Sequence, residues 1–254
     1  MRRISCFLAA CALALALGTT ASADPFFFST GDPDFRMAAA SRPESHKKIE
    51  IEAADDFIVA SATTLHQATF TGMLFRGGGG EIREVVVEIY RVFPKDSDTG
   101  RTIHVPSRTN SPSDVAFDDR SSADGNLRFT VTVLDHNARA ANSVIDGIHP
   151  SPDQTTGGDG AVKGQVVRID AVFDPPFELP ADHYFFVPQV RLQGRGSNFL
   201  WLSAAGPPVC VGDLQMWIRN ADLDPDWLRV GMDIVGGTVP PRFNGSFSLS
   251  GETP

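Results

Sequence analysis

The chain has 254 residues and carries 31 acidic against 22 basic side chains, a formal net charge of −9. This acidic balance argues against a polyanionic partner such as nucleic acid or an anionic lipid surface. The length suits one large all-β domain, because single sandwiches often exceed 200 residues.

Residues 1–23 have the three parts of a secretory signal peptide. Arg2 and Arg3 form a basic start, Cys6 to Leu17 form an apolar run, and Ala21-Ser22-Ala23 is a small-residue cleavage site. The apolar run is shorter than the roughly 20 residues that a membrane-spanning helix needs. We therefore expect an exported protein, periplasmic or extracellular, without a membrane span.

Two of the three cysteines lie in this signal peptide, and only Cys210 remains in the mature chain. A single cysteine cannot form an internal disulfide, so the domain must be stabilised by its own core. We expect Cys210 to be a small buried hydrophobic residue, since no histidine lies beside it in the sequence. One alternative stays open: Leu8-Ala9-Ala10-Cys11 resembles a lipoprotein cleavage motif, which would leave a lipidated Cys11.

Residues 24–48 predict an N-terminal segment made of one strand and loop. Phe26-Phe27-Phe28 favours the strand, Gly31-Asp32-Pro33-Asp34 favours a turn, and the remainder favours loop. The sandwich domain is expected over residues 49–251, followed by a short tail at 252–254.

Alternation and β-branched residues predict strands at 49–59, 63–75 and 84–93. Gly72 favours a bulge in the second strand. The four glycines at 77–80 favour a hairpin connection to the third strand. They do not predict a phosphate-binding loop, because no Lys-Ser or Lys-Thr follows them.

Residues 94–126 are polar and long for a connection, which indicates either a functional loop or a packed excursion. Residues 127–133 alternate and predict a strand with one wet face. Residues 137–148 favour one or two helical turns, and residues 150–160 favour a loop.

Residues 165–204 form the densest apolar block and predict strands at 165–173, 183–192 and 198–204. Proline cannot donate to a ladder, so Pro175-Pro176 is expected to end the first of these strands, and Pro188 to mark an edge or a bulge. The alternating residues expected to share one inter-sheet core are Phe129, Val131, Ile169, Phe173, Phe186, Val190, Phe247 and Leu249.

Residues 206–237 predict a structured loop on the sandwich, where a ligand would most readily bind. Within this loop, residues 213–219 favour a helical turn or a strand. Asp224-Pro225-Asp226-Trp227 favours a capped short helix with proline in its first turn. A strand over 243–249 closes the domain.

A period of two recurs along the chain, no segment keeps a period of 3.6 for three turns, and no repeat of 20–50 residues is visible. These patterns predict an all-β fold: a single jelly-roll-like β-sandwich with long loops and at most short helices.

Several stretches resemble, in the same order, a group of bacterial secreted β-sandwich modules that are largely of unknown function. They are Ala54-Asp-Asp-Phe57, the strand from Thr63 to Gly72, the corner Pro176-Phe-Glu-Leu-Pro-Ala-Asp-His-Tyr184, the Trp201 strand and Phe247-Ser-Leu-Ser-Gly251. Such modules are frequently carried by exported proteins with C-terminal sorting signals. The resemblance spans about residues 26–251 and implies fold and export, but no catalytic residue. The length of 94–126 departs from it, and no hydrophobic helix with a basic tail follows Gly251, so a sorting anchor is not expected.

Motifs of known hydrolases and metal enzymes are missing from the sequence: it has no Gly-x-Ser-x-Gly, His-Glu-x-x-His or Cys-x-x-Cys. The six histidines are scattered without ligand spacing. Asp222, Asp224 and Asp226 have the spacing of the first ligands of a calcium loop, but Trp227 stands where an EF-hand needs glycine. A looser Ca²⁺ site and plain turn or helix-capping aspartates both remain possible.

Trp201, Trp217 and Trp227, with Tyr184, are the candidates for a surface that stacks on sugar rings. The alternative is that all four are core residues. The expected function is a secreted, non-catalytic β-sandwich that binds or scaffolds, with a glycan or a protein as partner and no cofactor unless Ca²⁺ binds. The second hypothesis, a carbohydrate-binding module or carbohydrate-active enzyme, rests on acids, tryptophans and fold analogy alone.

Overall fold

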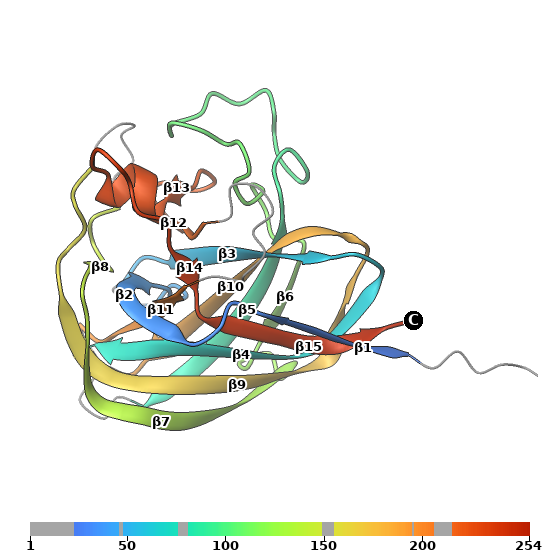
Figure 1. Cartoon of the computed structure of the whole chain (residues 1–254). Helices are drawn as coiled ribbons and strands as arrows, with labels where there is room; N and C mark the ends of the chain where they lie inside the picture. The colour runs from blue at the N-terminus through green and yellow to red at the C-terminus, as the bar shows by residue number, and fades with distance from the viewer. Residues whose placement is uncertain (1–22, 46–47, 76–80, 149–154, 195, 206–214) are drawn as a thin grey trace, which may run out of the picture.

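The computed structural model describes residues 23–45, 48–75, 81–148, 155–194, 196–205 and 215–254. Two β-sheets face each other around one core, and the larger sheet curls as a half-barrel (Figure 1). The fold is therefore the all-β sandwich that the sequence predicts. The helix among these residues is the single turn η1 (Val230–Val235). No helix within the described ranges has the length and apolarity that crossing a membrane requires.

The nine-stranded sheet is built around β4 (Thr63–Phe75). One edge of β4 pairs with β9 (Val162–Leu179), which in turn pairs with β7 (Leu127–Ala140). Its other edge pairs with β15 (Phe247–Thr253) and then with β11 (Asn198–Ala204). The remaining strands are β1 (Asp24–Ser29), β2 (Pro33–Ala40), β8 (Ser143–Val144) and β14 (Asn244–Gly245).

The six-stranded sheet has the order β13-β12-β3-β10-β5-β6. Its central strands are β3 (Ile51–Val59), β10 (Asp182–Leu192) and β5 (Ile82–Arg91). The outer strands are β12 (Trp217–Asn220), β13 (Leu228–Arg229) and β6 (Asp118–Ser121).

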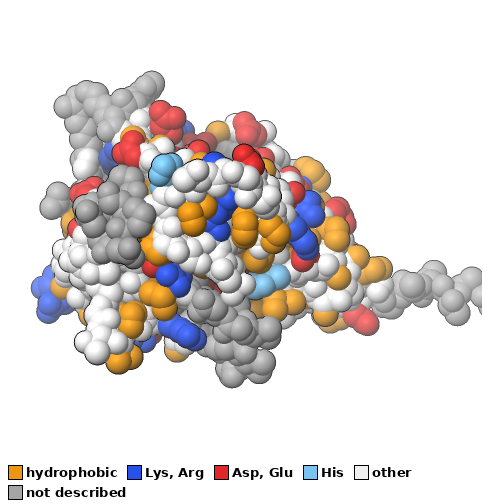
Figure 2. Space-filling view, turned by 90° about the horizontal axis from the view of Figure 1, so that it is seen from above, with side chains coloured by type: hydrophobic (Ala, Val, Ile, Leu, Met, Phe, Trp, Pro, Cys, Tyr) orange, Lys and Arg blue, Asp and Glu red, His pale blue; other side chains and the backbone are white. Residues whose placement is uncertain are grey.

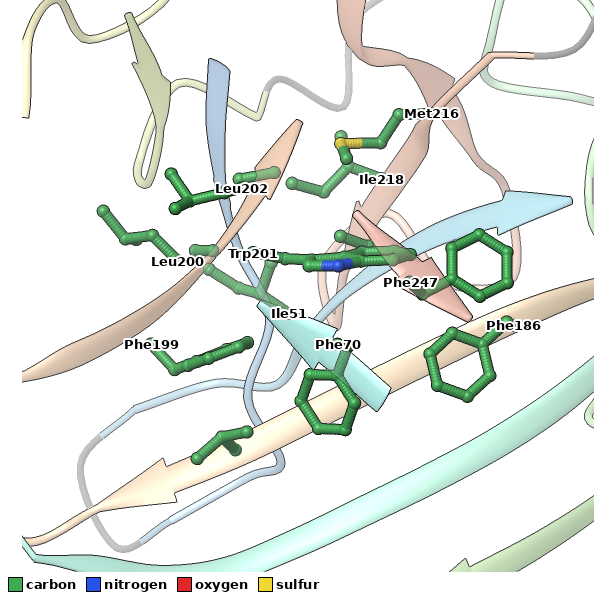
Figure 3. Close-up of a cluster of buried hydrophobic side chains, with 14 of the residues drawn as sticks. Ile51, Phe70, Phe186, Phe199, Leu200, Trp201, Leu202, Met216, Ile218 and Phe247 are labelled. Carbon is green, nitrogen blue, oxygen red and sulfur yellow. The ribbon is translucent and has the colours of Figure 1, made fainter. Parts of the chain in front are cut away.

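The core between the sheets is centred on Trp201, which projects from β11 among side chains of both sheets (Figure 3). The rings of Phe186 and Phe247 stack with centroids 4.9 Å apart, and Trp201 meets Phe247 edge-on at 5.8 Å. The indole N–H of Trp201 donates to the Ser246 carbonyl at 3.0 Å, so the one polar group of this side chain is satisfied. Six of the eight predicted core residues are buried here: Ile169, Phe173, Phe186, Val190, Phe247 and Leu249.

The other two predicted core residues lie on β7. Phe129 is partly buried and packs against the core, but the prediction is wrong for Val131, which is 42% exposed. Strand β7 is the outermost strand beyond β9, so Val131 and Val133 extend past the area that the second sheet covers. Alternation identifies the two faces of a strand but does not say whether another layer lies over either face.

A third layer covers the outer face of the six-stranded sheet. Residues 93–117, the green loop at the top of Figure 1, pack over an apolar cluster separate from the main core. Members of this cluster are Ala54, Tyr90, Phe185, Val187, Trp217 and Trp227. Figure 2 views the molecule from above; its described surface mixes acidic, basic and apolar side chains, and no kind dominates.

Three local predictions, of a loop, a hairpin and a helical turn, are wrong. Residues 33–40, expected to be loop after the turn, form strand β2. The glycines at 77–80 lie outside the described residues, and the strands they connect do not form a hairpin: β4 and β5 belong to different sheets. Residues 137–148 contain no helix, since β7 continues to Ala140 and β8 follows. Short-range patterns do not reveal whether a chain turns back on itself or crosses to the opposite sheet.

The bulge predicted at Gly72 is wrong, because this glycine stays in register with both neighbouring strands. The bulge lies opposite Pro175-Pro176: β4 pairs with Val172 and again with Phe177, and the residues between them loop out of the ladder. Strand β9 therefore continues past the two prolines to Leu179. Arg120 donates to both proline carbonyls, at 2.7 and 2.8 Å.

Pro188 lies in the central strand β10, where it pairs with Val87 of β5. Pairing of β10 with β3 ends at Phe186, and the Pro188 carbonyl accepts instead from the Ser41 hydroxyl at 2.6 Å. The proline thus occupies a position where one side of the strand has no ladder partner. Its missing N–H donor is tolerated there, although the strand is neither at an edge nor bulged at this position.

Residues 24–40, which form β1 and β2, and the C-terminal strand β15 are integral to the sandwich. Strand β1 pairs with β15 from Asp24↔Thr253 to Ser29↔Ser248. The signal-peptide prediction falls almost entirely on residues 1–22, and the Cys210 prediction on 206–214; both stretches lie outside the described residues.

Candidate functional site

The four aromatic residues predicted to stack on sugars are all buried. Trp201 and Trp217 have no exposed surface, and Trp227 and Tyr184 are each 1% exposed. Trp201 fills the main core, while the indole of Trp227 lies beneath the outer loop and donates to the Ser113 carbonyl at 3.2 Å. A ring with both faces packed has no surface for a sugar, so this geometry contradicts the stacking prediction and supports the core alternative.

The three aspartates predicted as calcium ligands point in different directions. Asp226 is buried and accepts two N–H groups of Arg101, at 2.7 and 2.9 Å, and the backbone N–H of His104. Asp224 pairs with Arg219 at 2.7 Å, while Asp222 is exposed. No three His, Cys, Asp or Glu side chains of the described residues gather so that they could hold a metal ion. A Ca²⁺ site here stays a prediction, which this arrangement does not favour.

The short helix predicted at Asp224-Pro225-Asp226-Trp227 is wrong: these residues leave a turn and enter β13. Their aspartates do not cap a helix. The amides of Leu223 and Asp224 instead bond back to the Asn220 carbonyl, each at 3.0 Å. The structured loop predicted over 206–237 is described from residue 215 on, where it contains the two short strands β12 and β13 and the turn η1; residues 206–214 lie outside the described residues.

The long stretch 94–126 is a packed excursion held by buried ion pairs. Arg101 and Arg108 both reach Asp114 and Asp226. Burial alone would raise the pKa of Asp226, but the hydrogen bonds from Arg101 and His104 and the nearby guanidinium charges hold it below its usual value. These ion pairs therefore hold the excursion against the outer face of the six-stranded sheet.

Beneath the excursion lies a cluster of carboxylates on the outer face of the six-stranded sheet. The Tyr90 hydroxyl lies 2.8 Å from Glu52 and 3.4 Å from Glu88, and Arg219 donates to both Glu52 and Tyr90. Burial, followed by the charge of Glu52, raises the pKa of Glu88 well above its ordinary value. This network is enclosed, and its groups hydrogen-bond chiefly to one another.

A cavity of about 960 Å³ opens at one end of the sandwich. It lies between the segment that links β2 to β3, the first residues of β9 and β11, and the segment after β8. The residues that line it include Arg42, Lys48 and Lys163, together with Asp146 and Asp159, and the apolar side chains Ile49, Phe75, Ile145 and Val162.

Arg42 is the buried charge of this cavity. The residue is 8% exposed, and its Nε and Nη1 atoms have no hydrogen-bond partner among the described residues. The backbone around it is fixed: Arg42 exchanges two hydrogen bonds with Ile51, at 2.7 and 3.0 Å. The neighbouring Ser41 hydroxyl donates to Pro188 and accepts from the Ala53 amide. The backbone that carries this guanidinium is thus held in place, while its Nε and Nη1 atoms have no hydrogen-bond partner among the described residues.

Further polar and cationic groups border the same cavity. Lys48 donates to the Ser197 carbonyl, and the Oδ1 atom of Asn198 is buried without a partner in the described part of the chain. Burial lowers the pKa of Arg42, which the charge of Asp146 partly offsets. Burial and then the charge of Arg42 lower the pKa of Lys48. Each cation therefore disfavours the other, and an anion placed between them would relieve both.

Sequence reasoning did not identify Arg42, because Ser41-Arg42-Pro43 has no motif and falls in a segment expected to be loop. Its role depends on residues from four separate segments that meet only in the fold. No protein-family model, no curated protein and no solved structure matches this chain.

Proposed function

We propose that this chain is an exported, non-catalytic β-sandwich that binds a small anionic ligand in the cavity around Arg42, called here the Arg42 pocket. The observation that carries the proposal is a buried guanidinium that lines a cavity of about 960 Å³ and has two nitrogens without a hydrogen-bond partner in the described part of the chain.

The physical reason is the cost of burying a charge. A cation removed from water costs several kcal/mol unless a counter-ion and hydrogen bonds replace the lost hydration. A carboxylate or phosphate supplies both, because a guanidinium presents paired N–H donors that match the oxygens of such groups. Lys48 adds a second cation to the same cavity. A preformed site of this kind needs little reorganisation when its ligand arrives.

The cavity favours binding over catalysis. Its carboxylate Asp159 accepts three backbone N–H groups, from Ile145, Asp146 and Gly147, and so is occupied in shaping the loop. The hydroxyl of Ser143 donates to the Gly160 carbonyl. In the described lining of the cavity, no nucleophile stands against a base.

Export is the second part of the proposal and rests on residues 1–23. Intact mass spectrometry of the protein collected outside the cytoplasm tests it: we expect a chain that starts at Asp24. A lipid-modified chain that starts at Cys11, or an unprocessed Met1, contradicts this part.

The binding test compares three proteins in low-salt buffer: the mature chain, Arg42→Gln and Arg128→Gln. Arg128 loses the same charge but is exposed on β7, where its contact is a 3.7 Å ion pair with Asp174. The ligands are phosphate, sulfate, acetate, citrate and glucuronate. Native-state binding at about 100 times Kd stabilises by roughly 2.7 kcal/mol, which raises Tm by roughly 5–10 °C.

We expect at least one of these anions to raise Tm in the mature chain and in Arg128→Gln but not in Arg42→Gln, with calorimetry giving Kd. Two results overturn the proposal: no anion binds, or the Arg42→Gln variant binds as tightly as the unchanged protein.

A further inference from the structure

The Arg42 pocket also has an acidic side. Asp146 lines it, and its side chain is exposed within a segment whose backbone is anchored by Asp159. The charge of Asp146 acts on Arg42, yet Asp146 is no hydrogen-bond partner of the Nε or Nη1 atoms of that guanidinium. A cation and an anion therefore stand in one cavity without neutralising each other directly.

A ligand with one negative group alone would satisfy only half of this arrangement. Such an ion would pair with Arg42 but would also meet the negative charges of Asp146 and Asp159. A metal ion fits less well, because Arg42, Lys48 and Lys163 outnumber the two carboxylates that line the cavity. The arrangement suits a molecule that carries both signs of charge.

We infer that the Arg42 pocket, taken as the anion site of the proposed function, binds an amino acid as a zwitterion, with its carboxylate on Arg42 and its ammonium group on Asp146. The apolar residues Ile49, Phe75 and Val162 supply the wall against which the aliphatic part of the ligand lies. This inference rests on the proposed function and narrows its ligand class.

The experiment uses paired ligands of increasing length. Glycine, 4-aminobutanoate and 6-aminohexanoate are compared with acetate, butanoate and hexanoate, which keep the carboxylate and lack the ammonium group. The N-acetyl derivatives of the three amino acids form a further series, in which the nitrogen is present but uncharged. Binding to the mature chain is measured by calorimetry for every ligand.

Three substitutions accompany the series. Asp146→Asn removes the proposed partner of the ammonium group, and Asp124→Asn removes the same charge from an exposed turn between β6 and β7. Arg42→Gln removes the proposed partner of the carboxylate. Circular dichroism confirms that each variant is folded, and the N-acetyl series tests the ammonium group without any substitution.

We expect at least one amino acid to bind the mature chain at least fivefold more tightly than its plain carboxylate and its N-acetyl derivative, a difference of about 1 kcal/mol. Asp146→Asn should remove this preference while carboxylate binding persists, Asp124→Asn should keep it, and Arg42→Gln should abolish binding of all three series.

The inference is overturned if amino acids and plain carboxylates bind equally and Arg42→Gln abolishes both; the anion-binding function then stands. It is also overturned if the preference persists in Asp146→Asn. If neither the carboxylates and amino acids nor the inorganic anions bind the mature chain, the proposed function fails as well.

Discussion

Two glycines make room for the largest rings of the core. A Cβ atom on Gly245 would lie 2.2 Å from the ring of Trp201, and one on Gly72 would lie 2.2 Å from the ring of Phe199. Neither glycine is needed for a left-handed backbone; each allows an aromatic side chain to lie flat against the neighbouring strand. Core interiors are close-packed, so a single added methyl group cannot be absorbed there without movement.

We expect Gly245→Ala to lower the free energy of unfolding by about 1–3 kcal/mol, the usual cost of overpacking a core. Urea unfolding followed by tryptophan fluorescence measures this loss. Gly100→Ala is the matched control, because a Cβ at this exposed loop position meets only Asp98, at 3.4 Å. Equal stability of the two variants would mean that Trp201 does not lie against Gly245.

At this residue scale, sequence patterns predicted the core residues better than they predicted the residues of the candidate site. Alternation placed Phe186, Ile169 and Phe247 correctly in the core, because every second residue of a covered strand points inward. The same rule gave no information on Arg42, whose burial results from the segments that surround it. The sequence did not decide whether the tryptophans belong to the core or to the surface, since a large ring in a strand is compatible with both until the covering layer is known.

At the scale of elements, the strands themselves were largely predictable, but their pairing was not. The prolines of β9 show why: Pro175 and Pro176 indicate the end of a ladder, and the ladder is interrupted there, but the strand resumes beyond a bulge. The fate of 94–126 was also left open. Its structure depends on Arg101 and Arg108 reaching Asp226, more than 100 residues away in sequence.

The ion pairs between the excursion and Asp226 lead to a prediction at the level of the element. Asp226→Asn leaves Arg101 and Arg108 beside a neutral amide with a single acceptor oxygen. We expect a loss of about 3 kcal/mol in the free energy of unfolding, the lower end of the cost of breaking a buried ion pair. Trypsin should also cleave faster after Arg101 or Arg108, because the excursion opens locally more often.

Asp222→Asn is the control for this change, since Asp222 is exposed and lies four residues away. It should remain within about 0.5 kcal/mol of the unchanged protein, as surface substitutions usually do. Identical trypsin cleavage of the two variants would show that the ion pairs do not hold the excursion in place.

At the scale of the whole molecule, two sets of buried acids respond to pH in opposite ways. Asp226 has a folded pKa below its ordinary value, so its stabilising contribution is complete above about pH 3.8 and is lost as the pH falls through the folded pKa. Burial raises the pKa of Asp55 and Glu88 well above their ordinary values. Their contribution is complete below the unfolded pKa, and it is lost as the pH rises through the folded value.

Two acidic groups with raised pKa values thus make the folded molecule less stable as the pH rises from about 4.5, the ordinary pKa of a glutamate. The cause at Glu88 is first its burial, which disfavours a charge, and then the negative charge of Glu52 beside it. Glu88→Gln removes the ionisable group and keeps a side chain of the same shape that can hydrogen-bond to Glu52 or to Tyr90. We therefore expect the difference in unfolding free energy between pH 5 and pH 8 to be smaller in Glu88→Gln than in the unchanged protein.

Urea unfolding of both proteins at pH 5, 6, 7 and 8 and at fixed ionic strength measures this difference. Glu44→Gln, an exposed position in the segment between β2 and β3, serves as the control for the change in net charge and should keep the full pH dependence. Since the unfolded chain titrates its glutamates near their ordinary pKa, any flattening confined to Glu88→Gln must come from the folded state. If the three proteins lose stability in parallel between pH 5 and pH 8, Glu88 ionises in the folded protein much as it does in the unfolded chain, and the enclosed carboxylate network does not hold a proton.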